Sequence, residues 1–341
     1  MDNKTNGFFM ISDINNCIIF GLSNGDQFAK EVAEKTGIRL GSITTSRFAD
    51  GEILVKSDNT VRGMDVFLFQ STSNPVNDNL MELLIAIDSL KRASANSITV
   101  IIPYYGYARQ DRKAKGREPI TCKLVANFLE NAGATKIILI DIHSAQTQGF
   151  FNIPVDTMTA SCVLFREFRK NNPGVIENLT MVAPDYGAVK NVRKISEILN
   201  VNLAIVDKRR PKPNVVEISN VLGDVENKDC LLIDDMIDTG GTILQNIELL
   251  KNKGCNKIFV MATHGVFSNN AIQKFEKALD NRLINELYIA DTIESNLKIN
   301  HPHIKVVKLS SFYAEILEAQ INHKSVSDIY KKYWDIVCNK T

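Results

Sequence analysis

The segment Leu231–Thr242 reads LLIDDMIDTGGT and contains three aspartates, two threonines and two adjacent glycines behind a short apolar run. Its apolar start predicts a buried strand, and the residues after Gly241 predict a helix. Glycine removes the side chains at this turn. The backbone amides of Thr239–Thr242 can therefore converge on one anion, near the positive end of the helix dipole. The segment predicts a phosphate-binding turn that uses no lysine.

The aspartates before this turn indicate what carries the phosphate. Asp234 and Asp235 are acceptors suited to the two neighbouring hydroxyls of a ribose ring. Since carboxylates repel phosphate, the ligand must be extended, with its phosphate at the glycines and its ring at the aspartates. A strand–helix turn with a capping aspartate is the alternative, and it would explain an isolated DTGG. The predicted contacts are Asp234, Asp235, Asp238, Thr239, Gly240, Gly241 and Thr242.

Short β-rich runs alternate with amphipathic helical stretches along almost the whole chain. The predicted strands are CIIFG, DVFLFQ, SITVIIP, KIILIDIH, LTMVAPD, NLAIVD, DCLLIDD, KIFVMATH and ELYIAD. Predicted helices include 78–94, 120–132 and 242–253, the last two ending before Gly133 and Gly254. This alternation predicts an α/β fold with parallel sheets covered by helices on both faces. Ligand sites are then expected at the carboxyl ends of the strands.

The chain of 341 residues is too long for one ordinary core, so two domains are expected. SITVIIPYYGYARQD and CLLIDDMIDTGGT both run from a buried strand into a polar loop, which suggests a duplicated domain. We place the domains at 1–160 and 161–341, with the last helix packing on the N-terminal domain. Residues 1–16 are expected to form a flexible extension.

Composition limits the possible function classes. A formal net charge of +1 gives no global basic field for nucleic acid. The longest apolar runs are strand-sized, and the first residues lack the pattern of a secretory signal. The six cysteines are widely spaced, which indicates reduced core thiols and no cysteine-based metal site. A cytoplasmic protein without membrane or nucleic-acid partners is expected.

The acidic glycine turn resembles the phosphoribosyl-diphosphate loop of the phosphoribosyltransferase fold family. By itself this resemblance leaves open a base phosphoribosyltransferase, a synthetase of the diphosphate and a ligand-sensing repressor. Four further stretches decide among them: RFADGE (47–52), YGYARQDRK (105–113), DIHSAQTQGFF (141–151) and DKRRPKPN (207–214). Together with the turn, they resemble the ribose-phosphate diphosphokinase family.

The resemblance implies two tandem phosphoribosyltransferase-type domains, each a mainly parallel sheet flanked by helices. It implies transfer of the diphosphoryl group of ATP to the anomeric hydroxyl of ribose 5-phosphate, which gives 5-phosphoribosyl 1-diphosphate and AMP for nucleotide biosynthesis. The alternatives are a non-catalytic regulatory homologue and a base phosphoribosyltransferase. No G-x-x-x-x-G-K-[ST] or G-x-G-x-x-G pattern occurs in the chain, so ATP must be held by other loops.

The same resemblance assigns residues to ATP and Mg²⁺. The implied ATP contacts are Phe48, Asp50, Gly51, Glu52, Arg109 and Gln110. A phenylalanine face can stack on adenine, and arginine suits phosphate, although a solvated basic loop or a turn with a buried aromatic would also produce these stretches. His143 and Asp185 are the last residues of predicted strands and are implied as ligands or near-ligands of Mg²⁺, a metal that prefers oxygen. His143 could instead donate a hydrogen bond to phosphate or to metal-bound water.

The basic segment DKRRPKPN follows another predicted strand, and its two prolines exclude a helix. Such a segment suits a lid over negatively charged reactants. The resemblance implies that Lys208 is the catalytic cation on the transferred diphosphoryl group. It also implies that Arg210 supports ribose 5-phosphate or the transition state.

Assembly and regulation are implied by the resemblance as well. Family members commonly form homohexamers in which the RFADGE stretch reaches the ATP site of a neighbouring subunit. Many respond to phosphate and ADP, and the C-terminal SVSDIY resembles that regulatory segment, with Ser325 and Ser327 as the implied phosphate contacts.

Overall fold

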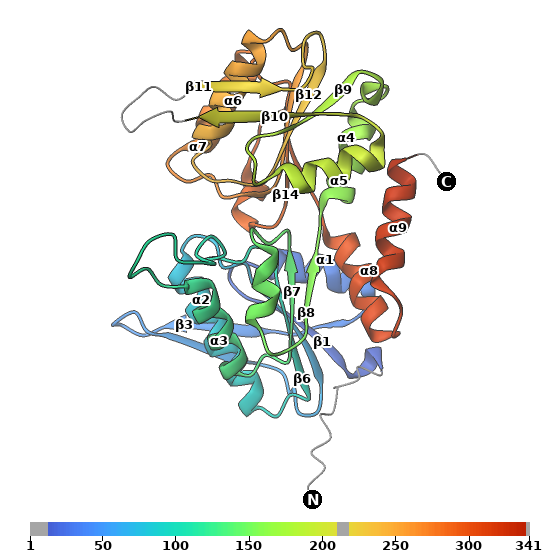
Figure 1. Ribbon diagram of the computed structural model, residues 1–341. Coiled ribbons are helices and arrows are strands. Elements are labelled where there is room, and N and C mark those ends of the chain that lie inside the picture. Colours follow the sequence, from blue (N-terminus) through green and yellow to red (C-terminus); the bar gives the residue numbers. More distant parts are fainter. Residues whose placement is uncertain (1–12, 210–217, 339–341) are drawn as a thin grey trace, which may run out of the picture. The chain divides into compact units, whose positions relative to one another are not determined.

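The computed structural model describes residues 13–209 and 218–338 (Figure 1). The chain forms two compact units. The first runs to Thr159 and is completed by Ser310–Ile329, and the second runs from Ala160 to Leu309 and is completed by the chain from Tyr330. Both units are α/β, which confirms the predicted fold class. Among the described residues, every helix is too short or too polar to span a membrane.

A six-stranded sheet in the order β2-β1-β5-β6-β7-β8 forms the centre of the first unit, and all neighbouring strands are parallel. The strands are β1 (Cys17–Gly21), β2 (Arg39–Leu40), β5 (Asp65–Phe69), β6 (Ser97–Ile102), β7 (Lys136–Ile140) and β8 (Val155–Met158). The helices are α1 (Asp26–Thr36), α2 (Val76–Arg92), α3 (Thr121–Ala132) and α8 (Ser310–Ile321), with 3-10 turns η1 (Ile14–Asn16) and η2 (Ala145–Phe150). Strands β5 and β6 are buried at every residue, as expected of a sheet covered on both faces.

Each face of this sheet has its own apolar layer. On one face α2 and α3 contribute Leu83, Ile87, Val125 and Leu129 to a buried cluster with alternate residues of the strands. On the other face, Phe28 of α1 packs edge-on against the fully buried Tyr313 of α8, with ring centroids 4.9 Å apart. Helix α8 thus supplies core to the first unit from near the end of the chain.

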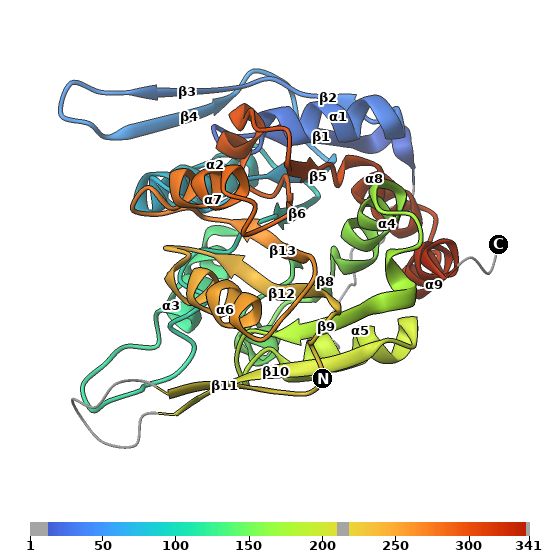
Figure 2. The same cartoon turned by 90° about the horizontal axis from the view of Figure 1, so that it is seen from above.

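A separate antiparallel hairpin, β3 (Ile43–Arg47) and β4 (Ile53–Ser57), belongs to the first unit. Its alternate residues Ile43, Ile53 and Val55 pack against the cluster that contains α2. The hairpin reaches away from α1, and its turn carries the RFADGE stretch (Figure 2).

The second unit contains a seven-stranded sheet in the order β11-β10-β9-β12-β13-β14-β15. Neighbouring strands are parallel except in the pair β10–β11, which is antiparallel. Its strands are β9 (Leu179–Ala183), β10 (Asn202–Arg209), β11 (Ile218–Leu222), β12 (Asp229–Ile237), β13 (Ile258–Gly265), β14 (Glu286–Ala290) and β15 (Ile304–Val307). The helices are α4 (Ser161–Asn171), α5 (Val189–Leu199), α6 (Gly241–Asn252), α7 (Ala271–Asp280) and α9 (Val326–Val337), with η3 (Val175–Asn178) and η4 (Glu294–Lys298). Helices α6 and α7 cover one face and α4 and α5 the other (Figure 1).

The predicted helices 78–94, 120–132 and 242–253 correspond to α2, α3 and α6, so the apolar spacing located them within two residues. Each predicted strand overlaps an observed one. The strands absent from the prediction are β3 and β4 of the hairpin and the outermost strands of the two larger sheets, β2, β8, β11 and β15.

Candidate active site

Strand β12 lies between β9 and β13 in the second unit, and its acidic end pairs with β13 alone. The strand continues through both aspartates to Ile237, which pairs with Gly265, so Asp234 and Asp235 are held by the sheet rather than by a loose loop. Asp234 Oδ1 accepts the backbone N–H of Asp235 at 2.9 Å. Burial, and then the charge of Asp235 and that of Asp185, raises the pKa of the Asp234 carboxyl to about 8. The strand end therefore gathers negative charge.

The two glycines after β12 differ in what they do. Gly240 has φ +72°, and a Cβ there would lie 2.5 Å from Cε2 of Phe275 on α7. Gly241 begins α6, and a Cβ there would meet nothing within 4 Å. Gly240 thus permits the turn, whereas Gly241 leaves open space at the helix start.

The start of α6 offers backbone donors to this open space. No side chain caps the helix at Gly240, and the first-turn amides of an α-helix have no partner within the helix itself. Thr239 and Thr242 are exposed beside them, while Asp238 is half-buried. The strand and the helix start predicted on either side of the turn are therefore both present. Such a geometry binds anions.

Asp185 is brought to the same part of the second unit. It follows β9, the neighbour of β12, and its exposed carboxylate accepts the backbone N–H of Ala188 at 3.1 Å. The side chain of Asn246, 1% exposed on α6, donates to the carbonyl of Pro184 at 3.0 Å. Asn246 thereby ties the glycine-bounded helix to the residue before Asp185.

Sequence reasoning missed Asn246. A signal was available, because it stands in the apolar stripe of α6 with Ile243, Ile247 and Leu250. A polar residue at such a position must find a partner when it is buried.

The basic segment is only partly described. Strand β10 runs through Lys208 to Arg209, whose backbone pairs with Ile218 of β11. The prediction that Lys208 follows the strand is therefore wrong, because the antiparallel partner β11 extends the pairing beyond the apolar run. Arg210 lies outside the described residues.

In the first unit, the hairpin turn is built by its own polar groups. Phe48 N–H donates to Glu52 O at 2.9 Å, and Glu52 N–H donates to Asp50 Oδ1 at 3.1 Å. Gly51 has φ +96°, which favours glycine. Phe48 is 56% exposed, so the alternative of a buried aromatic is wrong and the ring is available for stacking.

The cationic loop that follows β6 is anchored at both ends. Tyr104 and Tyr105 are buried, and the Tyr105 hydroxyl donates to the carbonyl of Cys122 at 3.1 Å. The Gln110 side chain accepts from Thr121 Oγ1 at 2.5 Å at the start of α3. Arg109 is exposed between these anchors. The contacts of Tyr105 and Gln110 therefore hold the part of the loop that carries Arg109.

The remaining predicted residues lie apart from these groups along the chain. His143 is exposed in the first unit, three residues beyond the end of β7, whereas Asp185 belongs to the second unit. Ser325 and Ser327 are exposed at the start of α9. Among the residues that the structure describes, no group of three His, Cys, Asp or Glu side chains is arranged to hold a metal ion.

Comparisons with known proteins bear directly on this arrangement. Residues 17–133 match the N-terminal domain of ribose phosphate pyrophosphokinase, and residues 184–331 match the phosphoribosyl synthetase-associated domain. The chain is 52% identical over 303 residues to the ribose-phosphate pyrophosphokinase of Ureaplasma parvum, covering 88% of this chain and 90% of that protein. It is 50% identical over 317 residues to that of Mycoplasma genitalium, covering 93% and 95%.

A solved structure agrees with these relatives. The phosphoribosylpyrophosphate synthetase from Mycobacterium smegmatis superposes with a TM-score of 0.83 at 38% identity, covering 90% of this chain and 99% of that one. Pyrophosphokinase and diphosphokinase are two names for the same activity. Because the matches extend over nearly the whole of both chains, this chain belongs to the ribose-phosphate pyrophosphokinase family and is an enzyme.

Proposed function

We propose that this enzyme transfers the diphosphoryl group of ATP to the anomeric hydroxyl of ribose 5-phosphate, forming 5-phosphoribosyl 1-diphosphate and AMP for nucleotide biosynthesis in the cytoplasm. The observation that carries the proposal is the acidic end of β12 joined through Gly240 to the uncapped start of α6. An anion site for the phosphate thus lies next to carboxylates that can accept hydrogen bonds from the sugar hydroxyls, as an extended sugar phosphate requires. The relatives' names agree with that ligand.

Ribose 5-phosphate is assigned to the second unit. Its phosphate would accept from the backbone amides of Gly241 and Thr242 and from the hydroxyls of Thr239 and Thr242, with Asp238 and Gly240 shaping the turn. Its ring hydroxyls would donate to Asp234 and Asp235. At neutral pH the raised pKa of Asp234 lets that carboxyl also donate a hydrogen bond.

ATP is assigned to the turn of the β3–β4 hairpin and to the cationic loop after β6, both in the first unit. The exposed ring of Phe48 would stack on adenine, with Asp50, Gly51 and Glu52 forming the turn that carries it. Arg109 would contact phosphate, and Gln110 would contribute a polar edge from its anchored position.

The transfer itself is mainly a matter of positioning and charge. The anomeric oxygen forms a bond to the β-phosphorus of ATP while the bond from that phosphorus to the oxygen bridging the α- and β-phosphates breaks, and AMP leaves. We assign Lys208 to the negative charge that develops on the transferred group, and Arg210 to ribose 5-phosphate or the same transition state. The hydroxyl proton is released to solvent.

Mg²⁺ is the proposed cofactor, and the second unit has suitable chemistry for it. Asp185 is an exposed carboxylate close enough to Asp234 to raise its pKa, so a cation would relieve their repulsion. A hard cation that keeps several waters needs only one or two carboxylates. When bound, Mg²⁺ would neutralise phosphate charge. His143 is better suited to donating a hydrogen bond to phosphate or to metal-bound water.

We also propose a homohexamer whose hairpin turn completes a neighbouring subunit's ATP site, and phosphate or ADP as effectors at Ser325 and Ser327. The alternative functions are weaker. A base phosphoribosyltransferase would leave the ATP-side elements without a use. A non-catalytic homologue is expected to depart at Lys208, Arg210 or the acidic turn, all of which this chain retains.

One assay tests the reaction. Purified protein is incubated with Mg²⁺, ATP and ribose 5-phosphate, and AMP and phosphoribosyl diphosphate are quantified together. Equal amounts of the two products are expected. AMP without the sugar diphosphate, or no product at all, would contradict the proposed function.

A further inference from the structure

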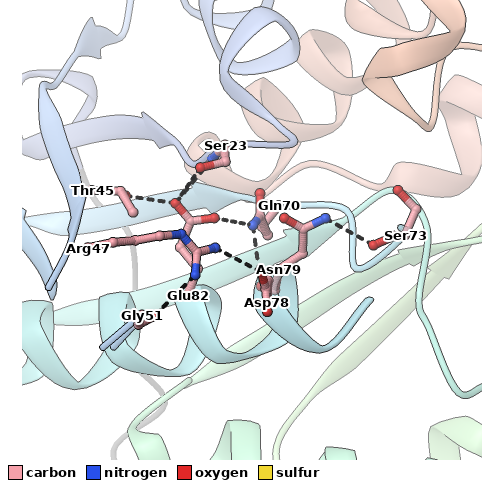
Figure 3. Close-up of polar contacts among 9 residues, drawn as sticks. All are labelled: Ser23, Thr45, Arg47, Gly51, Gln70, Ser73, Asp78, Asn79 and Glu82. Carbon is pink, nitrogen blue, oxygen red and sulfur yellow. Dashed lines mark hydrogen bonds and ion pairs between the residues drawn. The ribbon is translucent and has the colours of Figure 1, made fainter. Parts of the chain in front are cut away.

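Two carboxylates one helical turn apart on α2 hold the β3–β4 hairpin (Figure 3). Glu82 Oε1 accepts from Thr45 Oγ1 at 2.7 Å, and Asp78 Oδ2 pairs with Arg47 Nη2 at 2.9 Å. Thr45 and Arg47 are two residues apart on one face of β3, a rise of about 6.6 Å. Asp78 and Glu82 are four residues apart, a rise of about 6 Å. Strand and helix therefore match in register at both contacts.

Glu82 is the buried end of this attachment, with 3% of its surface exposed. Its Oε1 also accepts from Ser23 Oγ at 2.7 Å, and its Oε2 accepts from Gln70 Nε2 at 2.7 Å. The donors come from three places: the loop after β1, strand β3 and the residue that follows β5. A buried carboxylate is tolerated when its oxygens are hydrogen-bonded, so these donors fix Glu82 and, through Thr45, the hairpin.

Asp78 acts nearer the turn. Arg47, its partner, also donates from Nη1 to the carbonyl of Gly51 at 3.3 Å. Both side chains of the ion pair are 50% exposed, so the pair is screened by solvent and holds the turn less firmly than Glu82 holds the strand. Arg47 thus links Gly51, inside the turn, to α2.

The polar network continues from Glu82 toward the cationic loop. Gln70 Oε1 accepts the backbone N–H of Asn24 at 2.9 Å. Beyond Gln70, Ser71 Oγ accepts the N–H of Tyr104 at 3.1 Å, and Thr72 Oγ1 accepts the N–H of Gly106 at 2.7 Å. The segment after β5 therefore contacts both Glu82 and the start of the loop that carries Arg109.

We propose that Thr45, Asp78 and Glu82 are positioning residues that fix the Phe48–Glu52 turn for binding an adenine nucleotide. The proposal rests on the proposed function, which assigns ATP to that turn. The residues act through the hairpin and make no contact with the nucleotide. Loosening their attachment should therefore weaken ATP binding without changing the chemical step or the affinity for ribose 5-phosphate.

The principal test is Thr45→Val, with Thr44→Val as the matched control. Valine keeps the shape of threonine and suits a strand, so the fold is preserved. Thr45→Val removes only the hairpin's bond to Glu82. Thr44 faces the other way and binds the exposed Asp58 at 2.8 Å. We expect KM for ATP to rise about five- to thirtyfold in Thr45→Val, with kcat and KM for ribose 5-phosphate within about twofold of wild type. Thr44→Val should change none of the three by more than about twofold.

The ion pair is tested by Asp78→Asn and by its conservative counterpart Asp78→Glu. Because the pair is half-exposed, Asp78→Asn should raise KM for ATP only about two- to fivefold, and Asp78→Glu should restore most of the loss. Glu82→Gln is expected to have the largest effect, since it places an amide donor against existing donors. Its folding must be checked first.

Amide hydrogen exchange over residues 43–57 supplies a readout that does not depend on catalysis. Exchange in the hairpin should be faster in Thr45→Val than in Thr44→Val or wild type. If wild type makes no phosphoribosyl diphosphate, the proposed function fails while the exchange result still tests the attachment. Unchanged KM for ATP in an active Thr45→Val enzyme, or an equal rise in both KM values, would overturn the positioning role.

Discussion

Asp234 Oδ1 accepts the backbone N–H of Asp235 at 2.9 Å, although the two carboxylates repel each other. This contact fixes the first carboxylate at the end of β12 where the sheet holds both residues. The negative charge gathered there suits a cation and sugar hydroxyls, and in their absence it opposes ionisation of Asp234.

Because ionisation of Asp234 is unfavourable in the folded protein, the free energy of unfolding should decrease as the pH rises. The pKa of Asp234 is about 8 in the folded protein and near 3.8 without the fold, so folding favours the protonated form. The stability from Asp234 is fully present below pH about 4 and is lost as the pH rises to about 8. Asparagine cannot ionise. Asp234→Asn should therefore raise Tm by an amount that grows from pH 5 to pH 8.5, as measured by calorimetry without ligands.

Glu248→Gln, exposed on α6, is the control for this measurement and should show no such trend. A Tm difference between Asp234→Asn and wild type that is the same at pH 5 and pH 8.5 would exclude the raised pKa as its cause.

The two glycines at the start of α6, Gly240 and Gly241, should respond oppositely to substitution by alanine. Gly240→Ala forces a side chain into φ +72° and against Phe275, so it should lower the free energy of unfolding by about 1–3 kcal/mol. Gly241→Ala meets open space and should leave stability unchanged or higher. Its methyl group would nevertheless stand at the proposed phosphate position and raise KM for ribose 5-phosphate about tenfold or more. Denaturant unfolding and steady-state kinetics on both variants check this. Normal kinetics in Gly241→Ala would place the phosphate elsewhere.

Phe48 should matter for ATP and not for folding. It is 56% exposed, so Phe48→Ala should leave Tm within about 1–2 °C of wild type while KM for ATP rises about tenfold through lost stacking. Leu54→Ala, 46% exposed on the same hairpin, is the matched control and should leave KM nearly unchanged. Equal kinetic effects of the two substitutions would point to general disturbance of the hairpin.

Lys208 should affect turnover more than binding. Removing a cation that stabilises developing charge typically costs about 100-fold or more in kcat. Lys208→Ala should show such a loss, while the Kd of ATP, measured by calorimetry, rises less than about fivefold. Lys274→Ala, an exposed lysine on α7, serves as the control. Wild-type turnover in Lys208→Ala would remove this residue from the mechanism.

The sequence predicted the fold where burial is continuous. Central strands such as β5 and β6, buried at every residue, and the helices predicted at 78–94, 120–132 and 242–253 follow from pattern alone. The strands that pattern did not locate are β3 and β4 of the hairpin and the strands at the edges of the two large sheets, which are short or partly exposed, as in β2 and β8. An edge strand has no second neighbour to bury it, so its residues show little apolar signal.

The candidate site was predictable as motifs but not as contacts. In the LLIDDMIDTGGT segment, the residue types alone predict the turn. No local pattern reveals that Asn246 holds Pro184, or that Glu82 receives donors from three elements, because these partners are distant in sequence. Such contacts depend on the tertiary arrangement of the strands. A polar residue within an apolar helix stripe indicates from sequence that a buried polar contact exists, but it does not identify the partner.

Helix α8 has a consequence for how the chain folds during synthesis. Tyr313 fills the space beside Phe28 and Phe69, yet it is made after all of the second unit up to Leu309. A growing chain that has emerged only to Thr159 would leave those rings facing water. The first unit therefore cannot finish folding before Ser310–Ile321 has been translated, although most of its chain is made first.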